Sequence, residues 1–135
     1  THNKLEGDKK TPKGTYSLGP LYYRKDKLKP KTKLKKIQIK KNMGWCDDVL
    51  NKNYNKLIKI KKKIKHEKLY RKDRIYDLLI PINYNSSKPK KNKGSAIFLH
   101  LTNNYKKTLG CIAIKKKDMI ILLKLIDNKT KIKII

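Results

Sequence analysis

Three short apolar segments in the second half of the chain constrain the fold most strongly. Residues 95–101 are nearly all apolar, and residues 75–84 and 110–114 are rich in Ile, Leu or Tyr. Apolar runs of this length are typical of strands buried within a sheet. We therefore predict short buried strands, with residues 95–101 at the centre of a sheet. Pro81 predicts an edge position or a bulge for the strand in residues 75–84.

The remaining segments give weaker signals. Short or alternating apolar patterns predict strands at residues 15–18, 22–24, 34–39 and 130–135, and an edge or partly exposed strand at residues 57–64. Residues 44–48 are expected to form a structured loop, and residues 66–72 a single helical turn.

One helix is predicted, at residues 116–126. An apolar face that begins at Met119 and ends at Ile126 repeats there with the helical period. A chain of 135 residues fits a single domain, here residues 1–135. The expected fold class is mainly β with minor α: strands of mixed direction and one amphipathic helix near the C-terminus.

The strong positive charge is a poor guide to function. Lys and Arg number 38 and Asp and Glu 10, a formal net charge of +28 that would favour binding to polyanions. Only three of these basic residues are Arg, and Ile outnumbers Val by 17 to 1, as expected from AT-rich codons. We therefore expect no specific nucleic-acid partner, although the charge would attract the protein to an anionic envelope polymer.

Targeting and membrane signals are absent from these residues. No apolar run approaches the roughly 20 residues that a membrane-spanning helix needs, so no transmembrane segment is expected. The first residues contain no apolar segment of a secretory signal peptide.

A cysteine and a histidine are the best candidates for chemistry. His100 ends the most apolar segment, and Cys111 follows Gly110 at the start of the next predicted strand. An imidazole within reach of a thiol can take its proton and stabilise the thiolate. Gly110 allows a tight turn that directs backbone N–H groups at a developing oxyanion, and Thr108 adds a hydroxyl nearby.

Other uses of these side chains are less favoured. The two Cys and the His residues lack the close paired spacing of zinc ligands, so no metal or other cofactor is expected. A disulfide between Cys46 and Cys111 would inactivate the proposed nucleophile. We therefore expect Cys111 to be a free thiol and Cys46 to be structural.

Three ordered motifs resemble the L,D-transpeptidase catalytic domain family, also called YkuD. Residues 6–16 (EGDKKTPKGTY) resemble its GD-x-x-TP-x-G-x-(F/Y) opening, residues 94–100 (GSAIFLH) the strand that delivers its histidine, and residues 108–113 (TLGCIA) its (S/T)-x-G-C nucleophile motif. Residues 44–48, 54–55 and 71–77 resemble one bacterial branch of the family. The likeness implies a YkuD-like β-sandwich, and since the family usually has a strand before its opening loop, a longer natural protein.

The resemblance implies a mechanism. Cys111 would be the nucleophile and His100 the general base and later acid, with a backbone carbonyl orienting the ring. The N–H groups of Gly110 and Cys111 would form much of the oxyanion hole, and Thr108 would shape that loop. The substrates would be peptidoglycan stem peptides, joined in 3→3 cross-links, which implies a cell-envelope or periplasmic location.

The rest of the site is less determined. Trp45, Tyr84 and Ser95 are candidates for contacting substrate, although the two aromatic residues equally suit packing roles. Many family members have His at the position of Leu109 and Arg or Asn at that of Ala113, which puts the choice of substrate in question. Water as acceptor would give an L,D-carboxypeptidase. A basic polyanion-binding module and a non-catalytic relative that only holds wall peptides are the other hypotheses.

Overall fold

The computed structural model describes all 135 residues, Thr1 to Ile135. Ten short strands and one helix follow one another along the chain: β1 (Gly14–Ser17), β2 (Leu21–Tyr23), β3 (Lys36–Gln38), β4 (Met43–Cys46), β5 (Leu57–Lys59), β6 (His66–Lys68), β7 (Leu78–Pro81), β8 (Phe98–Leu101), β9 (Ile112–Ile114), α1 (Lys116–Leu125) and β10 (Lys131–Ile134). The expected class, mainly β with mixed strands and one helix near the C-terminus, is confirmed.

A five-stranded mixed sheet forms the centre of the molecule. Its strand order is β3-β2-β7-β8-β9, with parallel pairs at both ends and antiparallel pairs between them. Every residue of β7 and β8 is buried, as their apolar sequences predict. Residues 95–101 therefore do supply a central strand, although its ladder begins only at Phe98.

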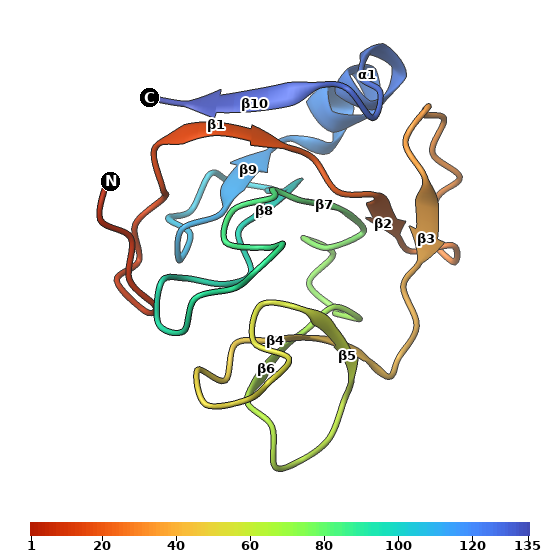
Figure 1. Ribbon diagram of the computed structural model, residues 1–135. Coiled ribbons are helices and arrows are strands. Elements are labelled where there is room, and N and C mark those ends of the chain that lie inside the picture. Colours follow the sequence, from red (N-terminus) through yellow and green to blue (C-terminus); the bar gives the residue numbers. More distant parts are fainter.

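Two layers cover opposite faces of this sheet (Figure 1). On one face, Ile80 and Leu99 pack in a core with Met119 and Leu123 of α1, close to the two-stranded sheet of β1 and β10. Because side chains alternate along a strand, the neighbouring residues of β7 and β8 point to the other face. There Phe98 belongs to a second core, beside the three-stranded sheet β5-β4-β6.

Two predictions in the small sheet were wrong. Residues 44–48 are not a loop throughout, because β4 runs from Met43 to Cys46 with Gly44 and Cys46 buried. Residues 66–72 do not form a helical turn, because His66–Lys68 is strand β6 and pairs with β4. His66 lies close to Gly44. A Cβ at residue 44 would lie 3.1 Å from the imidazole, which leaves little room for a side chain there. Strand β5 does lie at an edge, as expected.

Two details of the large sheet also differ from expectation. Pro81 marks neither an edge strand nor a bulge: β7 lies between β2 and β8, and the proline occupies its last position, where its carbonyl accepts the N–H of Gly19. Strand β9 is half-buried rather than buried, because it forms the edge of the sheet. The helix ends at Leu125, one residue earlier than predicted.

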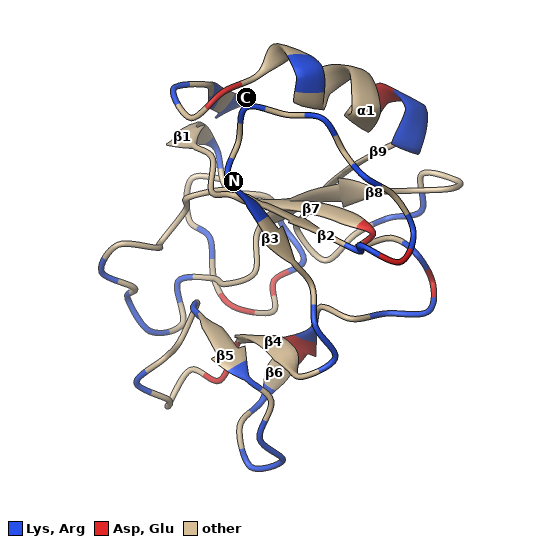
Figure 2. Ribbon diagram, turned by 90° about the vertical axis from the view of Figure 1, so that its right-hand side faces the viewer, with Lys and Arg blue, Asp and Glu red and all other residues tan.

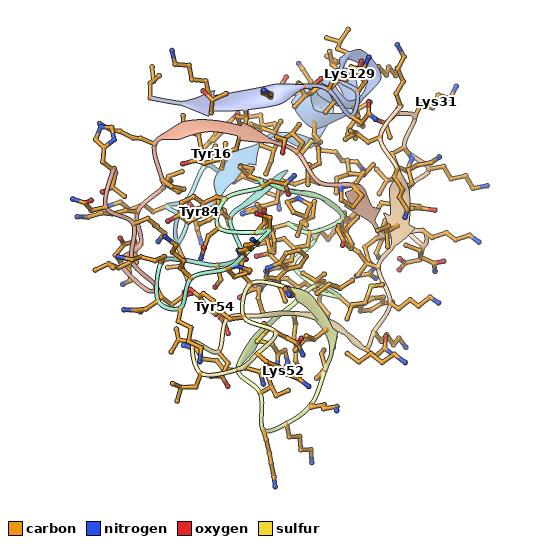
Figure 3. All side chains as sticks on the ribbon, viewed as in Figure 1. Tyr16, Lys31, Lys52, Tyr54, Tyr84 and Lys129 are labelled. Carbon is orange, nitrogen blue, oxygen red and sulfur yellow. The ribbon has the colours of Figure 1, made fainter.

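Basic side chains are spread over the molecule rather than gathered on one face (Figure 2). Figure 3 shows Lys31, Lys52 and Lys129 pointing outward at widely separated positions. This distribution gives no single polyanion-binding stripe. The helix of the structure is too short and too polar to cross a bilayer.

Candidate active site

A cavity of about 730 Å³ opens between the five-stranded sheet, the N-terminal loop and strand β6. Of the residues expected at the site, four line it: Ser95, His100, Thr108 and Cys111. The imidazole on β8 and the thiol just before β9 thus line the same cavity, because these two strands are neighbours in the sheet and pair in parallel. The cavity is large enough to admit part of a peptide.

The surroundings of His100 favour a neutral imidazole that can accept a proton. It lies on the face of β8 opposite the α1 core and is 6% exposed. Its Nδ1 lies 2.8 Å from the carbonyl oxygen of Leu101. Because a carbonyl only accepts, Nδ1 carries the proton and Nε2 keeps its lone pair. Burial lowers the pKa of His100 below its usual value, and the ring is therefore neutral at pH 7.

Cys111 is a protonated thiol in this structure. Its Sγ lies 3.2 Å from the carbonyl oxygen of Ala96, to which it donates, and accepts the N–H of Phe98 at 3.4 Å. Burial raises the pKa of Cys111 to about 11. The thiol is hydrogen-bonded to Ala96 and not to His100, so the neutral forms of both groups are favoured over a thiolate and an imidazolium. Both cysteines are free.

The turn before Cys111 requires glycine. Gly110 has φ +120°, and a Cβ there would lie 2.7 Å from the carbonyl oxygen of Lys10. The hydroxyl of Thr108 closes this turn, because it donates to the carbonyl of Cys111 at 2.6 Å and accepts the N–H of Gly110 at 3.3 Å. The N–H of Gly110 is thus occupied, whereas that of Cys111 makes no hydrogen bond within the protein. The Cys111 N–H is therefore the one of the two that remains available to an oxyanion.

The N-terminal motif, residues 6–16, contacts this turn. The carboxylate of Asp8 accepts the N–H groups of Leu5 and Lys10 at 2.9 Å each and pairs with Lys4. Partial burial would raise the pKa of Asp8, but these hydrogen bonds lower it to about 2. Asp8 thereby fixes the loop whose Lys10 carbonyl packs against Gly110. The first and third sequence motifs meet at this contact.

The three candidates for contacting substrate are placed differently. Ser95 lines the cavity, where its hydroxyl donates to Glu6 at 2.6 Å. Trp45 instead packs edge-on against Phe98, with its indole N–H on Asn55. Tyr84 donates to the carbonyl of Lys93, packs edge-on against Tyr16 (Figure 3) and does not line the cavity. Leu109 is 72% exposed at the rim.

Sequence reasoning missed a polar group beside His100. The ring of Tyr76 packs edge-on against His100 at 5.2 Å between centroids, and its hydroxyl donates to Glu67 at 3.0 Å. Arg71 also donates to this Glu67 oxygen at 3.0 Å. Glu67 gave no signal, because it was assigned to a helical turn rather than to β6.

Charges of both signs line the cavity. Beside basic residues such as Lys4 and Arg71, its walls carry the carboxylates of Glu6, Asp47 and Glu67. Burial raises the pKa of Asp47, and its Oδ1 is buried without a hydrogen-bond partner. Acidic side chains are rare in this chain, so the cavity holds an unusual share of them. No group of His, Cys, Asp and Glu is arranged to hold a metal ion.

Comparison with known proteins gives one match. A family model described as "L,D-transpeptidase catalytic domain" (YkuD) matches residues 3–134. No curated protein and no solved structure matches the chain. The matched range includes the cavity and every residue that has been discussed as part of it.

Proposed function

The chain belongs to the family of L,D-transpeptidase catalytic domains, and we propose that it is a peptidoglycan L,D-transpeptidase with Cys111 as nucleophile and His100 as general acid and base. One observation carries this proposal: the thiol and a neutral imidazole with a free Nε2 line the same cavity. A neutral His is the form that can accept a proton from a thiol.

The first half-reaction forms a thioester. The proton of Cys111 passes to Nε2 of His100 as sulfur attacks the carbonyl carbon after the third residue, a diamino acid, of a stem peptide. The backbone N–H of Cys111 stabilises the oxyanion of the tetrahedral intermediate. As this intermediate collapses, the bond to the terminal D-alanine breaks, and its amine takes the proton from His100.

The second half-reaction transfers the acyl group to the acceptor and frees Cys111. An amine of another stem attacks the thioester carbonyl and gives a proton to Nε2, and sulfur leaves and is protonated again. The product is a 3→3 cross-link, and the net change is exchange of D-alanine for the acceptor amine. Water in place of the amine would give the carboxylic acid of an L,D-carboxypeptidase.

The walls of the cavity include carboxylates that could bind an amine-bearing substrate. Four carboxylates stand among the basic side chains of the lining. Glu67 and Asp73 pair with Arg71, which leaves Glu6 and Asp47 for the ammonium group of a diamino acid. Ser95 is the remaining candidate for contacting the peptide. We propose that the protein works in the cell envelope, where its positive surface would be attracted to anionic polymers of the wall. No cofactor is needed for either half-reaction.

A muropeptide assay tests this function. The full chain is incubated with a purified disaccharide-tetrapeptide, and the products are separated and identified by mass spectrometry. We expect loss of D-alanine with formation of a 3→3 dimer, absent with Cys111→Ala and retained with Cys46→Ala. Monomeric tripeptide alone would identify the carboxypeptidase. Unchanged substrate with folded protein would refute both.

A further inference from the structure

Asn55 is a buried polar residue to which the mechanism assigns no part. It follows β4 in the turn to β5, is 5% exposed, and its amide uses all four of its hydrogen-bonding positions. The Oδ1 accepts the indole N–H of Trp45 at 2.8 Å and the backbone N–H of Ala96 at 3.1 Å. The Nδ2 donates to the carbonyls of Tyr84 at 3.0 Å and Asn85 at 2.6 Å.

Ala96 has an unfavourable backbone conformation. Its φ of +53° lies in the left-handed region, which is unfavourable for a residue with a Cβ. The preceding residues are also tied to neighbouring segments: the N–H of Gly94 donates to the Tyr54 hydroxyl, and Ser95 donates to Glu6. The bond from Ala96 N–H to Asn55 is thus one of several that stabilise this segment, and the one at Ala96 itself.

The Ala96 carbonyl in turn determines where the thiol proton lies. It accepts the S–H of Cys111 at 3.2 Å. A hydrogen bond to the protonated form of an acid favours that form, so this contact favours the thiol over the thiolate. The Phe98 N–H, which donates to the same sulfur, has the opposite effect.

We propose that Asn55 is a positioning residue that holds the backbone of Ala96 at its N–H, so that the Ala96 carbonyl on the other side of the Cα keeps Cys111 in the protonated, resting state. The inference rests on the proposed function only in taking Cys111 as the nucleophile. Asn55 lies in a turn of the three-stranded sheet, and the Cys111 thiol lies just before β9 of the five-stranded sheet. The proposed effect therefore passes from one sheet to the other. For reaction, the S–H bond turns from the Ala96 oxygen toward Nε2 of His100, which takes the proton as sulfur bonds to the substrate carbonyl.

Asn55→Ala leaves the charged groups around the thiol unchanged. Glu67, on β6, raises the pKa of Cys111, and Lys4, in the N-terminal loop, lowers it. His100, on β8, is neutral and adds no charge near the thiol. Burial is the largest cause of the raised pKa of Cys111, and Asn55 does not line the cavity, so we attribute a shift of the thiol pKa on Asn55→Ala to the Ala96 contact.

The test is the pH dependence of alkylation of Cys111 by iodoacetamide, followed by mass spectrometry of the Cys111 peptide. Asn55→Ala removes the bond to Ala96 N–H, and we expect the apparent pKa of the thiol to fall by about one unit, with several-fold faster alkylation at pH 8. Asn83→Ala is the matched control, because Asn83 bonds only to Ser17, away from the cavity. Its profile should be that of the wild-type protein.

Asn55→Asp separates positioning from general support. Aspartate keeps an oxygen for the Ala96 N–H but loses the donors to Tyr84 and Asn85, so the protein is destabilised while the thiol pKa stays at or above the wild-type value. The added carboxylate by itself raises the thiol pKa, so only a lowered value for Asn55→Asp is decisive, and it would indicate a merely structural role. A lowered pKa for Asn55→Ala beside an unchanged profile for Asn83→Ala supports the proposal. An unchanged profile for Asn55→Ala would overturn it, and if Asn55→Ala does not fold, a lowered pKa for Asn55→Asp still overturns it. Alkylation needs no turnover, so failure of the muropeptide assay would not be mistaken for failure here.

Discussion

The two sheets that face each other across the second core differ in composition and in role. In the five-stranded sheet, β7 and β8 are wholly buried and apolar, and this sheet carries His100 and, just before β9, Cys111. The strands of the three-stranded sheet are largely half-buried or exposed, yet this sheet and its turns supply Asn55 and Glu67. On our proposals, the apolar sheet carries the reacting groups, and the polar sheet orients them and shifts the pKa of the thiol.

The largest expected difference between the sheets is in stability. Ile80→Ala, in the centre of β7 where the side chain is fully buried, should lower the free energy of unfolding by about 2–5 kcal/mol because it leaves a cavity. Ile58→Ala, at the edge of the small sheet where the side chain is only partly covered, should cost about 1 kcal/mol. Urea unfolding measures both. Equal losses would mean that the small sheet is as tightly packed as the large one.

A smaller effect is expected where the N-terminal loop meets the nucleophile turn. Gly110→Ala combines a positive φ with a Cβ 2.7 Å from Lys10 O, and should lower stability by about 2–3 kcal/mol. Gly7→Ala has a positive φ but open space around the Cβ, so its cost should be about 1 kcal/mol. Thermal unfolding compares them. If Gly7→Ala is the more damaging, the contact with Lys10 is not what requires glycine.

Removing the charge of Glu67 should change reactivity more than stability. Glu67→Gln can keep its hydrogen bonds to Tyr76 and Arg71, but its negative charge no longer raises the pKa of Cys111. Alkylation of the thiol at pH 8 should become about two- to threefold faster. Asp118→Asn, on α1 outside the cavity, controls for net charge. A slower rate in Glu67→Gln would show that the carboxylate does not act on the thiol electrostatically.

The smallest expected effect is a pH dependence of stability due to His100. Burial lowers its pKa in the folded state, so between that pKa and about 6.5 the unfolded state binds more protons. The folded protein therefore loses stability as the pH falls below about 6.5, by at most about 1.4 kcal/mol per pH unit from this group. His100→Asn should have a shallower slope between pH 7.5 and 5 in urea unfolding. Equal slopes would mean that His100 titrates normally.

The sequence predicts the large sheet better than the small one for a physical reason. Residues 75–84 and 95–101 are apolar because both faces of their strands are covered, and such runs are recognisable. Strands β4 and β6 contain Gly44, His66 and charged residues, and so show no such apolar run. Their strand conformation depends on pairing across the sheet. Local sequence gives no sign of that pairing.

The same limit applies to the site. His100, Gly110 and Cys111 could be identified from the apolar strands and the glycine turn, and Thr108 from the motif. The proposed roles of Asn55, Glu67 and Tyr76 depend on contacts between residues 9 to 41 positions apart. Asn55 and Tyr76 lie in segments that resemble the family, but the resemblance does not reveal these contacts. Trp45 was noticed for its aromatic ring, but its burial against Phe98 is a consequence of how the two sheets pack.

The most direct test of the account is acylation of Cys111 by a carbapenem, followed by mass spectrometry of the intact protein. The thiol adds to the β-lactam carbonyl and opens the ring, so the predicted result is a gain of one carbapenem mass in the wild-type protein and in Cys46→Ala, and none in Cys111→Ala. A folded wild-type protein without the adduct, or an adduct that persists in Cys111→Ala, would contradict the claim that Cys111 is the nucleophile.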